Sequence, residues 1–333
     1  MSMPVPEMVK TPDVPTPDSP AANQVAGRSP TRIAMERLRS DKVAVISAAI
    51  ILTFVVLAIL APVICNAAGV ELRTGDPSED TDAFNYPIIG WPNFNWDSRA
   101  PLGLEPNNGN DLLAEWVYGA RTSLEVASIT TLLTTIIGVV VGLVAGFSRG
   151  WLDRIISFII DVCLSFPFLL GALAFAPILL NRFGADPEAL DKAQFFSLIF
   201  ILTFFGWMGL ARLIRGEVLS LREREFVQSA RVIGVPTSSV LFKELLPNLL
   251  APIVVSISLS LPAYVTAEAG LAYLGIGLTG RPSWGQTINR AVPYFDEYWQ
   301  FLWAPVIGIM LLVVALNLFG DAVRDAFDPK TRR

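Results

Sequence analysis

The sequence contains no histidine, and this absence excludes several kinds of chemistry at once. Histidine is the usual general base of serine hydrolases and the commonest protein ligand of metals, so serine–histidine triads and most zinc sites are ruled out. Cysteine is almost absent too: Cys65 and Cys163 lie far apart, each inside an apolar run. We expect both to be buried apolar side chains rather than a redox pair or a metal site.

Charge is also scarce. Only 17% of the 333 residues are charged, 53% are hydrophobic, and the mean hydropathy is +0.52. Soluble domains usually carry about 25% charged residues, so these values predict a polytopic membrane protein. We therefore expect an all-α fold surrounded by membrane lipid, with no nucleic acid partner.

Six stretches are apolar and long enough to cross a bilayer, whose core of about 30 Å needs roughly 20 helical residues. They are residues 43–65, 122–147, 155–180, 196–210 with a tilted or interfacial extension to 215, 249–269 and 301–319. The first starts too far along the chain, and is too long, for a signal peptide. Pro167 and Pro262 should kink the third and fifth spans.

Lysine and arginine set the expected orientation. Six of them lie in residues 1–42, another six in 212–243, and more follow residue 319, whereas 66–119 has two against nine acidic residues. Cytoplasmic segments carry the basic excess, so both termini and the 212–243 loop should be cytoplasmic. The 66–119 loop should be extracytoplasmic, held by Trp91, Phe94 and Trp96 against the outer ends of the spans.

The expected organisation follows from these assignments. Its five parts are a disordered proline-rich cytoplasmic tail (1–31), an interfacial segment with the first span (32–65), an extracytoplasmic loop (66–119), a membrane-embedded core (120–320) that includes a cytoplasmic loop (217–247), and a cytoplasmic tail (321–333).

Two features inside the spans have more than one interpretation. Gly138, Gly142 and Gly146 line one helix face and allow close packing, either within this chain or against another subunit. Asp161 is costly in a membrane unless it faces protein or water; it could hydrogen-bond between helices or take part in a proton relay.

The loop after the fourth span predicts a helix–turn–helix elbow outside the membrane. Residues 221–233 have a helical pattern, Gly234 fits the position after the helix end, and Pro236 stops the helix. Thr237 can cap a second short helix, which Pro247 ends.

Apolar side chains on this elbow stand among charges. Val235, Leu241 and Phe242 either fold back onto the protein's own helices or form a knob for a cytosolic partner.

This elbow resembles the cytoplasmic loop of ABC importer permeases, whose pattern is Glu-Ala-Ala, three residues, Gly, nine residues, Ile, any residue, Leu-Pro. The positions that align are Gln228, Ser229, Ala230, Gly234, Glu244, Leu246 and Pro247. The second alanine, the glycine, the leucine and the proline match, whereas Gln, Ser and Glu replace the other three. Residues 35–64, 111–124 and 267–286 resemble the second permease subunit of dipeptide, oligopeptide and nickel importers, and the run around Pro282–Gly285 is highly specific.

The resemblance implies a type I importer permease with six transmembrane helices in a prokaryotic plasma membrane. It implies a heterodimer with a second permease subunit, two ATPase subunits that bind ATP and Mg, and an extracytoplasmic substrate-binding protein. Residues 120–320 would form the permease core, and the elbow, within the coupling loop 217–247, would dock on an ATPase subunit. The residues that we expect along the transport path are Asp161, Ser165, Ser258 and Glu268. The chain has no phosphate-binding GxxxxGK[ST] motif, so we expect no catalytic site and no cofactor in it. Short peptides are favoured as substrate over nickel, because the chain has no histidine and few cysteines.

Two other classes of protein are less consistent with the sequence. A secondary transporter predicts inverted repeats and ionisable residues at the middle of the membrane, and an intramembrane enzyme needs a nucleophile–base pair or a metal cluster. The sequence supports neither.

Overall fold

The computed structural model describes residues 30–70, 81–90, 97, 99–180 and 187–328. These residues are mostly helical, and β pairing among them is limited to isolated bridges such as Thr81 with Pro87. The predicted tail and the predicted contacts of Trp91, Phe94 and Trp96 lie outside the described residues.

Five helices are long and apolar enough to cross a membrane: α2 (Lys42–Ile59), α5 (Leu112–Phe147), α8 (Pro187–Leu221), α12 (Leu250–Tyr273) and α14 (Trp299–Phe327). A sixth crossing is available if α6 (Trp151–Ser165) and α7 (Phe168–Leu180) act as one bent pair. The prediction of an all-α polytopic membrane fold is confirmed.

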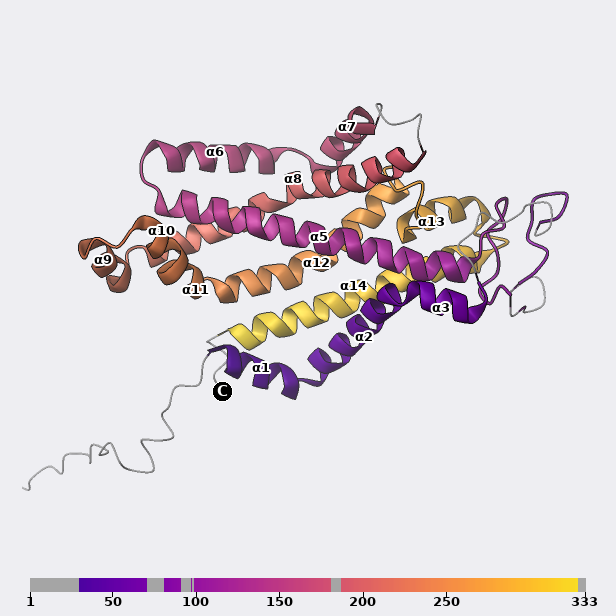
Figure 1. Cartoon of the computed structure of the whole chain (residues 1–333), viewed down its shortest axis with the longest axis horizontal. Helices are drawn as coiled ribbons and strands as arrows, with labels where there is room; N and C mark the ends of the chain where they lie inside the picture. Colours follow the sequence, from indigo (N-terminus) through magenta and orange to yellow (C-terminus); the bar gives the residue numbers. More distant parts are fainter. Residues whose placement is uncertain (1–29, 71–80, 91–96, 98, 181–186, 329–333) are drawn as a thin grey trace, which may run out of the picture.

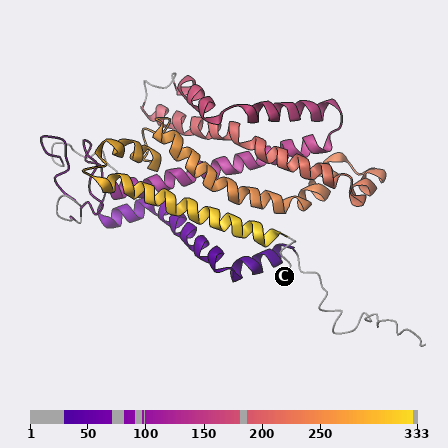
Figure 2. The ribbon, with the colours of Figure 1, turned by 180° about the vertical axis from the view of Figure 1, so that it is seen from behind.

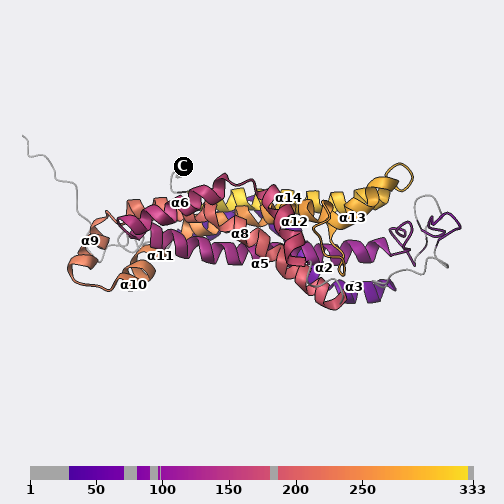
Figure 3. The ribbon, with the colours of Figure 1, turned by 90° about the horizontal axis from the view of Figure 1, so that it is seen from above.

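The long helices run along one axis of an elongated molecule (Figure 1). One end carries the elbow, formed by α9 (Glu225–Val232), α10 (Thr237–Ser239), a π-helical turn (Val240–Leu245) and α11 (Leu246–Asn248). The opposite end carries α3 (Ala61–Ala68), α13 (Trp284–Ala291) and the 81–111 loop. We call these the elbow end and the loop end. From behind, α12 and α14 run side by side (Figure 2), and from above the bundle is a long, thin layer (Figure 3).

The third predicted span breaks at Pro167. Phe166 is extended, at φ −80° and ψ 128°, because the ring of a following proline disfavours helical backbone. The chain bends by 89° between α6 and α7. Pro262, the second predicted kink, lies inside α12, which continues as one helix.

The fourth span does not end where its apolar run ends. The apolar residues stop at 210, but α8 continues as a helix to Leu221. Its two arginines in this stretch pair with carboxylates of α6: Arg215 with Asp153 at 2.7 Å, and Arg212 with Asp161. These cross-helix pairs neutralise charges that a hydropathy reading assigns to a loop.

The three glycines of α5 pack within this chain. A Cβ added at Gly142 would lie 2.7 Å from the Cβ of Ile214 and 2.8 Å from the carbonyl oxygen of Ala211, both on α8. Gly138 and Gly146 face α8 in the same way. The interpretation as intramolecular packing is therefore confirmed, and α5 and α8 approach more closely than side chains would allow.

A buried ion-pair network closes the loop end. Arg290 of α13 pairs with Glu105 of the 81–111 loop at 2.6 Å and with Glu115 of α5 at 2.7 Å. Both carboxylates are nearly fully buried, and Thr287 donates a hydrogen bond to Glu115. This network joins α13 to the 81–111 loop and the start of α5, about 175 residues earlier in the sequence.

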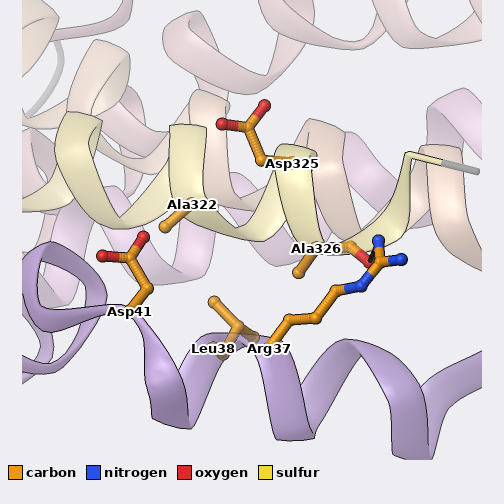
Figure 4. Close-up of a pocket in the computed structure, with 6 residues that line it drawn as sticks. All are labelled: Arg37, Leu38, Asp41, Ala322, Asp325 and Ala326. Carbon is orange, nitrogen blue, oxygen red and sulfur yellow. Dashed lines mark hydrogen bonds between the residues drawn. The ribbon is translucent and has the colours of Figure 1, made fainter. Parts of the chain in front are cut away.

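A short helix, α1 (Pro30–Ser40), holds the end of α14 (Figure 4). Arg37 donates hydrogen bonds to the carbonyl oxygens of Ala326 and Asp328, at 3.4 and 3.3 Å. A cation there satisfies the free carbonyls and the negative end of the helix dipole. Asp41 then caps α2 by accepting a hydrogen bond from the Val43 N–H at 2.8 Å.

Candidate coupling and transport surfaces

The elbow turns at Gly234. Its φ is +84°, the left-handed region, which residues with a Cβ adopt reluctantly. The Val235 N–H donates to the Ala230 carbonyl at 3.0 Å, and the Gly234 N–H donates to the Arg231 carbonyl at 3.1 Å. These two bonds form a Schellman motif, so the predicted helix end at Gly234 is confirmed.

The second half of the elbow is a tight series of short helices. Thr237 was predicted to cap the second helix, but the cap residue is Pro236 and Thr237 is the first residue of α10. The chain then passes through the π-helical turn and α11, which contains Pro247, into α12.

The base of the elbow is buried against the long helices. Four of its apolar side chains are fully buried and pack with residues of α5, α8 and α12. The cluster consists of Val227, Val240, Leu245, Leu249, Leu143, Ile214, Val218 and Ile253. The elbow is therefore a packed extension of the bundle.

Two arginines add polar contacts between the elbow region and the end of α5. Arg222 donates hydrogen bonds to the carbonyls of Gly146 and Ser148, at 3.0 and 3.3 Å, and so caps α5. Arg231 of α9 stacks over the Phe147 ring, with its guanidinium carbon 4.3 Å from the ring centroid. Burial, and then repulsion from the nearby arginines, lowers the pKa of Arg231.

The tip of the elbow presents apolar side chains to solvent. Val232 is 87% exposed, Ile233 is 80% exposed and Phe242 is 56% exposed. Phe226, which follows the first residue of α9, is exposed as well. We call these four residues the apolar tip. Several large exposed apolar side chains on one short segment are typical of a protein contact.

The structure divides the predicted knob. Phe242 belongs to the apolar tip, whereas Val235 and Leu241 are half-buried against the base cluster. Sequence reasoning did not select Val232 and Ile233. Their position could have indicated them, because both residues directly precede the Gly234 turn, where a helix that ends outside the membrane has no further helix to pack against.

The remaining predicted coupling residues lie around this tip. Gln228 is exposed and donates a hydrogen bond from its amide nitrogen to the Glu223 carbonyl at 3.1 Å. Ser229 and Pro247 are exposed, and Ala230 and Leu246 are half-buried.

Asp161 and Ser165 both lie on the exposed side of α6. The Asp161 carboxylate pairs with Arg212 of α8, and their side chains are 63% and 57% exposed. The Ser165 hydroxyl donates to the Asp161 carbonyl at 2.8 Å. Asp161 therefore makes the interhelical contact that the sequence allows, yet it stays accessible.

The other two predicted path residues are placed differently. Ser258 is half-buried on α12, where its backbone packs against Gly320 of α14. Glu268 is fully buried, and it accepts a hydrogen bond from Ser123 of α5 at 2.7 Å. Because its carboxylate is enclosed by the chain's own helices, Glu268 joins α5 to α12 instead of lining a surface.

The described residues hold no group of three or more histidine, cysteine or acidic side chains placed to bind a metal ion. Cavities of about 340 and 400 Å³ lie on either side of the Arg121–Glu125 pair of α5, and one of about 270 Å³ lies between α1 and α14 (Figure 4). The features that the described residues offer for function are therefore the apolar tip and the ion pairs between helices.

Comparison with known proteins decides the family. The model of the binding-protein-dependent transport system inner membrane component matches residues 138–333, which is more than half of the chain. This chain belongs to that family. A second model, the N-terminal transmembrane domain of oligopeptide transport permease C, matches residues 29–80. The chain is thus a multi-pass inner-membrane protein of a transport permease family.

Several curated relatives of this permease match over nearly the whole length. A dipeptide transport system permease protein of Alkalihalophilus pseudofirmus is 32% identical over 306 residues, covering 91% of each chain. An oligopeptide transport system permease protein of Bacillus subtilis is 31% identical over 305 residues, covering 90% of each. Its counterpart in Escherichia coli K12 is 33% identical over 304 residues, covering 90% of this permease and 91% of the relative.

One solved structure shares the fold of this permease. A chain of the MetNI methionine ABC transporter, in an inward-facing conformation, aligns with a TM-score of 0.53 at 19% identity. The alignment covers 65% of this permease and 98% of that chain. It supports the expected ABC importer permease fold.

Proposed function

We propose that this permease is one of two membrane-spanning subunits of an ATP-driven importer of short peptides. The names of its full-length relatives, which are dipeptide and oligopeptide transport permeases, support this substrate class. The apolar tip is the structural observation that carries the proposal, because it offers a contact surface on a base packed into the long helices.

The proposed assembly contains a second permease subunit, two ATPase subunits and an extracytoplasmic substrate-binding protein. ATP and Mg bind to the ATPase subunits, and one of these subunits contacts the apolar tip. When the ATPase subunits close, they move the elbow, and the helices packed on its base follow. Such a stroke acts through contacts that differ between the two states of the transporter, so the elbow transmits movement and takes no part in catalysis.

The proposed orientation puts the elbow end in the cytoplasm. The α1 helix and the end of α14, joined through Arg37, lie toward the same end of the molecule as the elbow (Figure 1), which fits cytoplasmic termini. We propose that substrate passes between this chain and its permease partner along the exposed side of α6, at Asp161 and Ser165. Ser258 of α12 is retained as a candidate for the same path, and Glu268 is omitted because it is fully buried.

The test is transport by the assembled complex in proteoliposomes. We expect uptake of a labelled dipeptide to require ATP and the substrate-binding protein, and to persist after ionophores collapse all ion gradients. Uptake that stops with the gradient and ignores ATP would refute the proposal in favour of a secondary transporter. The same assay with labelled nickel tests the alternative substrate: uptake of nickel in place of the dipeptide would assign this permease to a nickel importer.

The contact at the apolar tip has its own test. Ile233→Asp and Phe242→Asp each put a charge where an apolar contact forms, so ATPase subunits should no longer co-purify with the permease. Lys243→Gln, which changes the charge of an exposed neighbour on the same elbow, should leave co-purification near its normal level. Normal co-purification of both Asp variants would exclude the tip as the docking surface.

A further inference from the structure

The Asp161–Arg212 ion pair is both charged and exposed within the region of the spans. Both side chains are more than half exposed, although each belongs to a helix of the bundle. The neighbouring Asp153–Arg215 pair is much less exposed, at 21% and 28%. Asp161 and Arg212 thus present a carboxylate and a guanidinium side by side on the surface of the chain.

The depth of the pair makes exposure to lipid unfavourable. Asp161 lies six residues beyond Ile155, where the third apolar span begins, which is about 9 Å along a helix and therefore inside a 30 Å membrane core. Arg212 follows directly on the apolar run of α8, which stops at residue 210. Because a charged side chain within the hydrocarbon is unfavourable unless it faces water or protein, this face meets water or polar groups.

A polar stripe connects the pair to the elbow end. Asp153, Ser157, Asp161 and Ser165 recur every four residues and therefore form a stripe that turns slowly around α6. Its first two residues are half-buried toward α8 and its last two are exposed, whereas the exposed Ile155 and Ile159 lie on another side of the helix. The stripe thus connects the exposed Asp161–Arg212 pair to the less exposed Asp153–Arg215 pair.

The two ion pairs along this stripe are each neutral, because each carboxylate has its own arginine on α8. The Asp161–Arg212 pair therefore has no net charge but presents a positive and a negative group side by side, while Arg154 adds an exposed cation near the start of the helix. Such a surface is poorly matched to a simple cation or anion. It complements a molecule that carries an ammonium group at one end and a carboxylate at the other.

We propose that the Asp161–Arg212 pair is a contact site for zwitterionic substrate inside the transport path. The Asp161 carboxylate receives the ammonium group, and the Arg212 guanidinium receives the carboxylate. In the absence of substrate the two residues neutralise each other. This inference rests on the proposed function and adds the substrate chemistry that this chain recognises, which peptides with free ends share with free amino acids.

The first test is accessibility to water in the assembled complex, held in nanodiscs and lacking its own cysteines through Cys65→Ala and Cys163→Ala. Ser157→Cys and Ser165→Cys should react with hydrophilic methanethiosulfonates at least tenfold faster than the matched Ile155→Cys and Ile159→Cys variants. Equal rates for the two sets would overturn the inference.

Charge selectivity gives the second test. With the pair intact, the cationic trimethylammonium reagent and the anionic sulfonate reagent should modify the Ser165→Cys variant at similar rates. Arg212→Gln should favour the cationic reagent by about tenfold, and Asp161→Asn should favour the anionic one by a similar factor, as expected for one charge at close range. Unchanged ratios would mean that the pair does not face the path.

Protection and transport identify the ligand. Dialanine should slow modification of the Ser165→Cys variant, whereas N-acetyl-dialanine amide, which has no charged end, should not. If alanine protects as well, the site also accepts free amino acids. If neither compound protects, the proposed zwitterion site is refuted. Uptake of dialanine should fall about tenfold in Asp161→Asn and Arg212→Gln complexes that assemble normally. Glu188→Gln, which removes another exposed ion pair of α8, should not reduce it.

These results separate the two levels of proposal. If the unmodified complex takes up dialanine with ATP while these assays show no effect, only the zwitterion site is wrong. If the unmodified complex does not transport dialanine, the proposed function itself fails.

Discussion

At Gly234 a single backbone angle determines the shape of the elbow. The position has φ +84°, yet an added Cβ would meet no atom within 4 Å. Substitution there is therefore limited by the left-handed backbone and not by space, and the cost is about 1–2 kcal/mol for residues that resist this conformation.

Because backbone conformation and not space limits this position, two substitutions of Gly234 should behave differently. Gly234→Val should distort the turn, displace the apolar tip, and sharply lower both peptide uptake and peptide-stimulated ATP hydrolysis. Gly234→Asn should retain most of both activities, since asparagine tolerates left-handed backbone. Membrane levels of both variants should be normal, because the hydrogen bonds of the spans are internal. Equal activities of the two variants would show that the turn geometry does not affect coupling.

Arg290 illustrates a residue whose importance comes from burial. It is the cation between Glu105 and Glu115, and burial raises the pKa of Glu105 above its ordinary value, with Arg290 opposing that rise. Removing the arginine leaves two buried carboxylates without a partner charge, which costs about 3–5 kcal/mol.

Arg290→Gln should therefore lower the thermal stability of the purified permease far more than Arg99→Gln. Arg99 is 72% exposed in its pair with Asp97, and such pairs contribute about 0–1 kcal/mol. The defect of Arg290→Gln should be largest above the pKa of Glu105 in the folded variant. It should shrink as the pH falls, because protonation removes the unpaired charge. Melting curves at pH 5 and pH 8 test this, and a defect that grows toward pH 5 would contradict it.

Among the elements, α5 and α8 form the closest helix pair, and the fit depends on glycine. Gly142 faces the backbone of α8, whereas Gly209 of α8 itself has open space around it. The two glycines thus provide the same substitution in opposite environments.

Gly142→Ala should destabilise the isolated permease in detergent by about 1–3 kcal/mol, the usual cost of overpacking. Gly209→Ala should be neutral or stabilising, since alanine favours helix by up to about 1 kcal/mol over glycine. Thermal melting of both variants is the measurement. Equal stability would show that the α5–α8 contact can open to admit a methyl group.

The sequence predicted those elements whose determinants are local. Gly234 and Pro167 act on their own backbone, and the glycine spacing of α5 is visible in one helix. The sequence extended the fourth span only to residue 215 and missed its continuation to Leu221, because Arg212 and Arg215 resemble loop residues until their partners on α6 are known. The burial of Glu268 depends in the same way on Ser123, which lies 145 residues away.

At the scale of the whole molecule, the proposed orientation places the elbow end in the cytoplasm and the loop end outside, and this predicts which introduced cysteines an impermeant reagent reaches. Phe84 in the 81–111 loop is 79% exposed, and Ser238 is exposed on the elbow at the opposite end. In the background without native cysteines, the Phe84→Cys variant should react with an impermeant maleimide in intact cells. The Ser238→Cys variant should react only after permeabilisation. The reverse pattern would invert the topology.

The length of α5 has a mechanical consequence. Its 36 residues span about 54 Å, more than a membrane core, so one rigid helix carries the elbow base at one end and Glu115 at the other. Because glycine contacts bind it tightly to α8, the two helices would tilt as a single beam about a point within the membrane. A force on the elbow would then move the Arg290 network at the loop end in the opposite direction. In the assembly proposed above, the tilt of this helix pair would therefore couple the ATPase subunits to the substrate-binding protein.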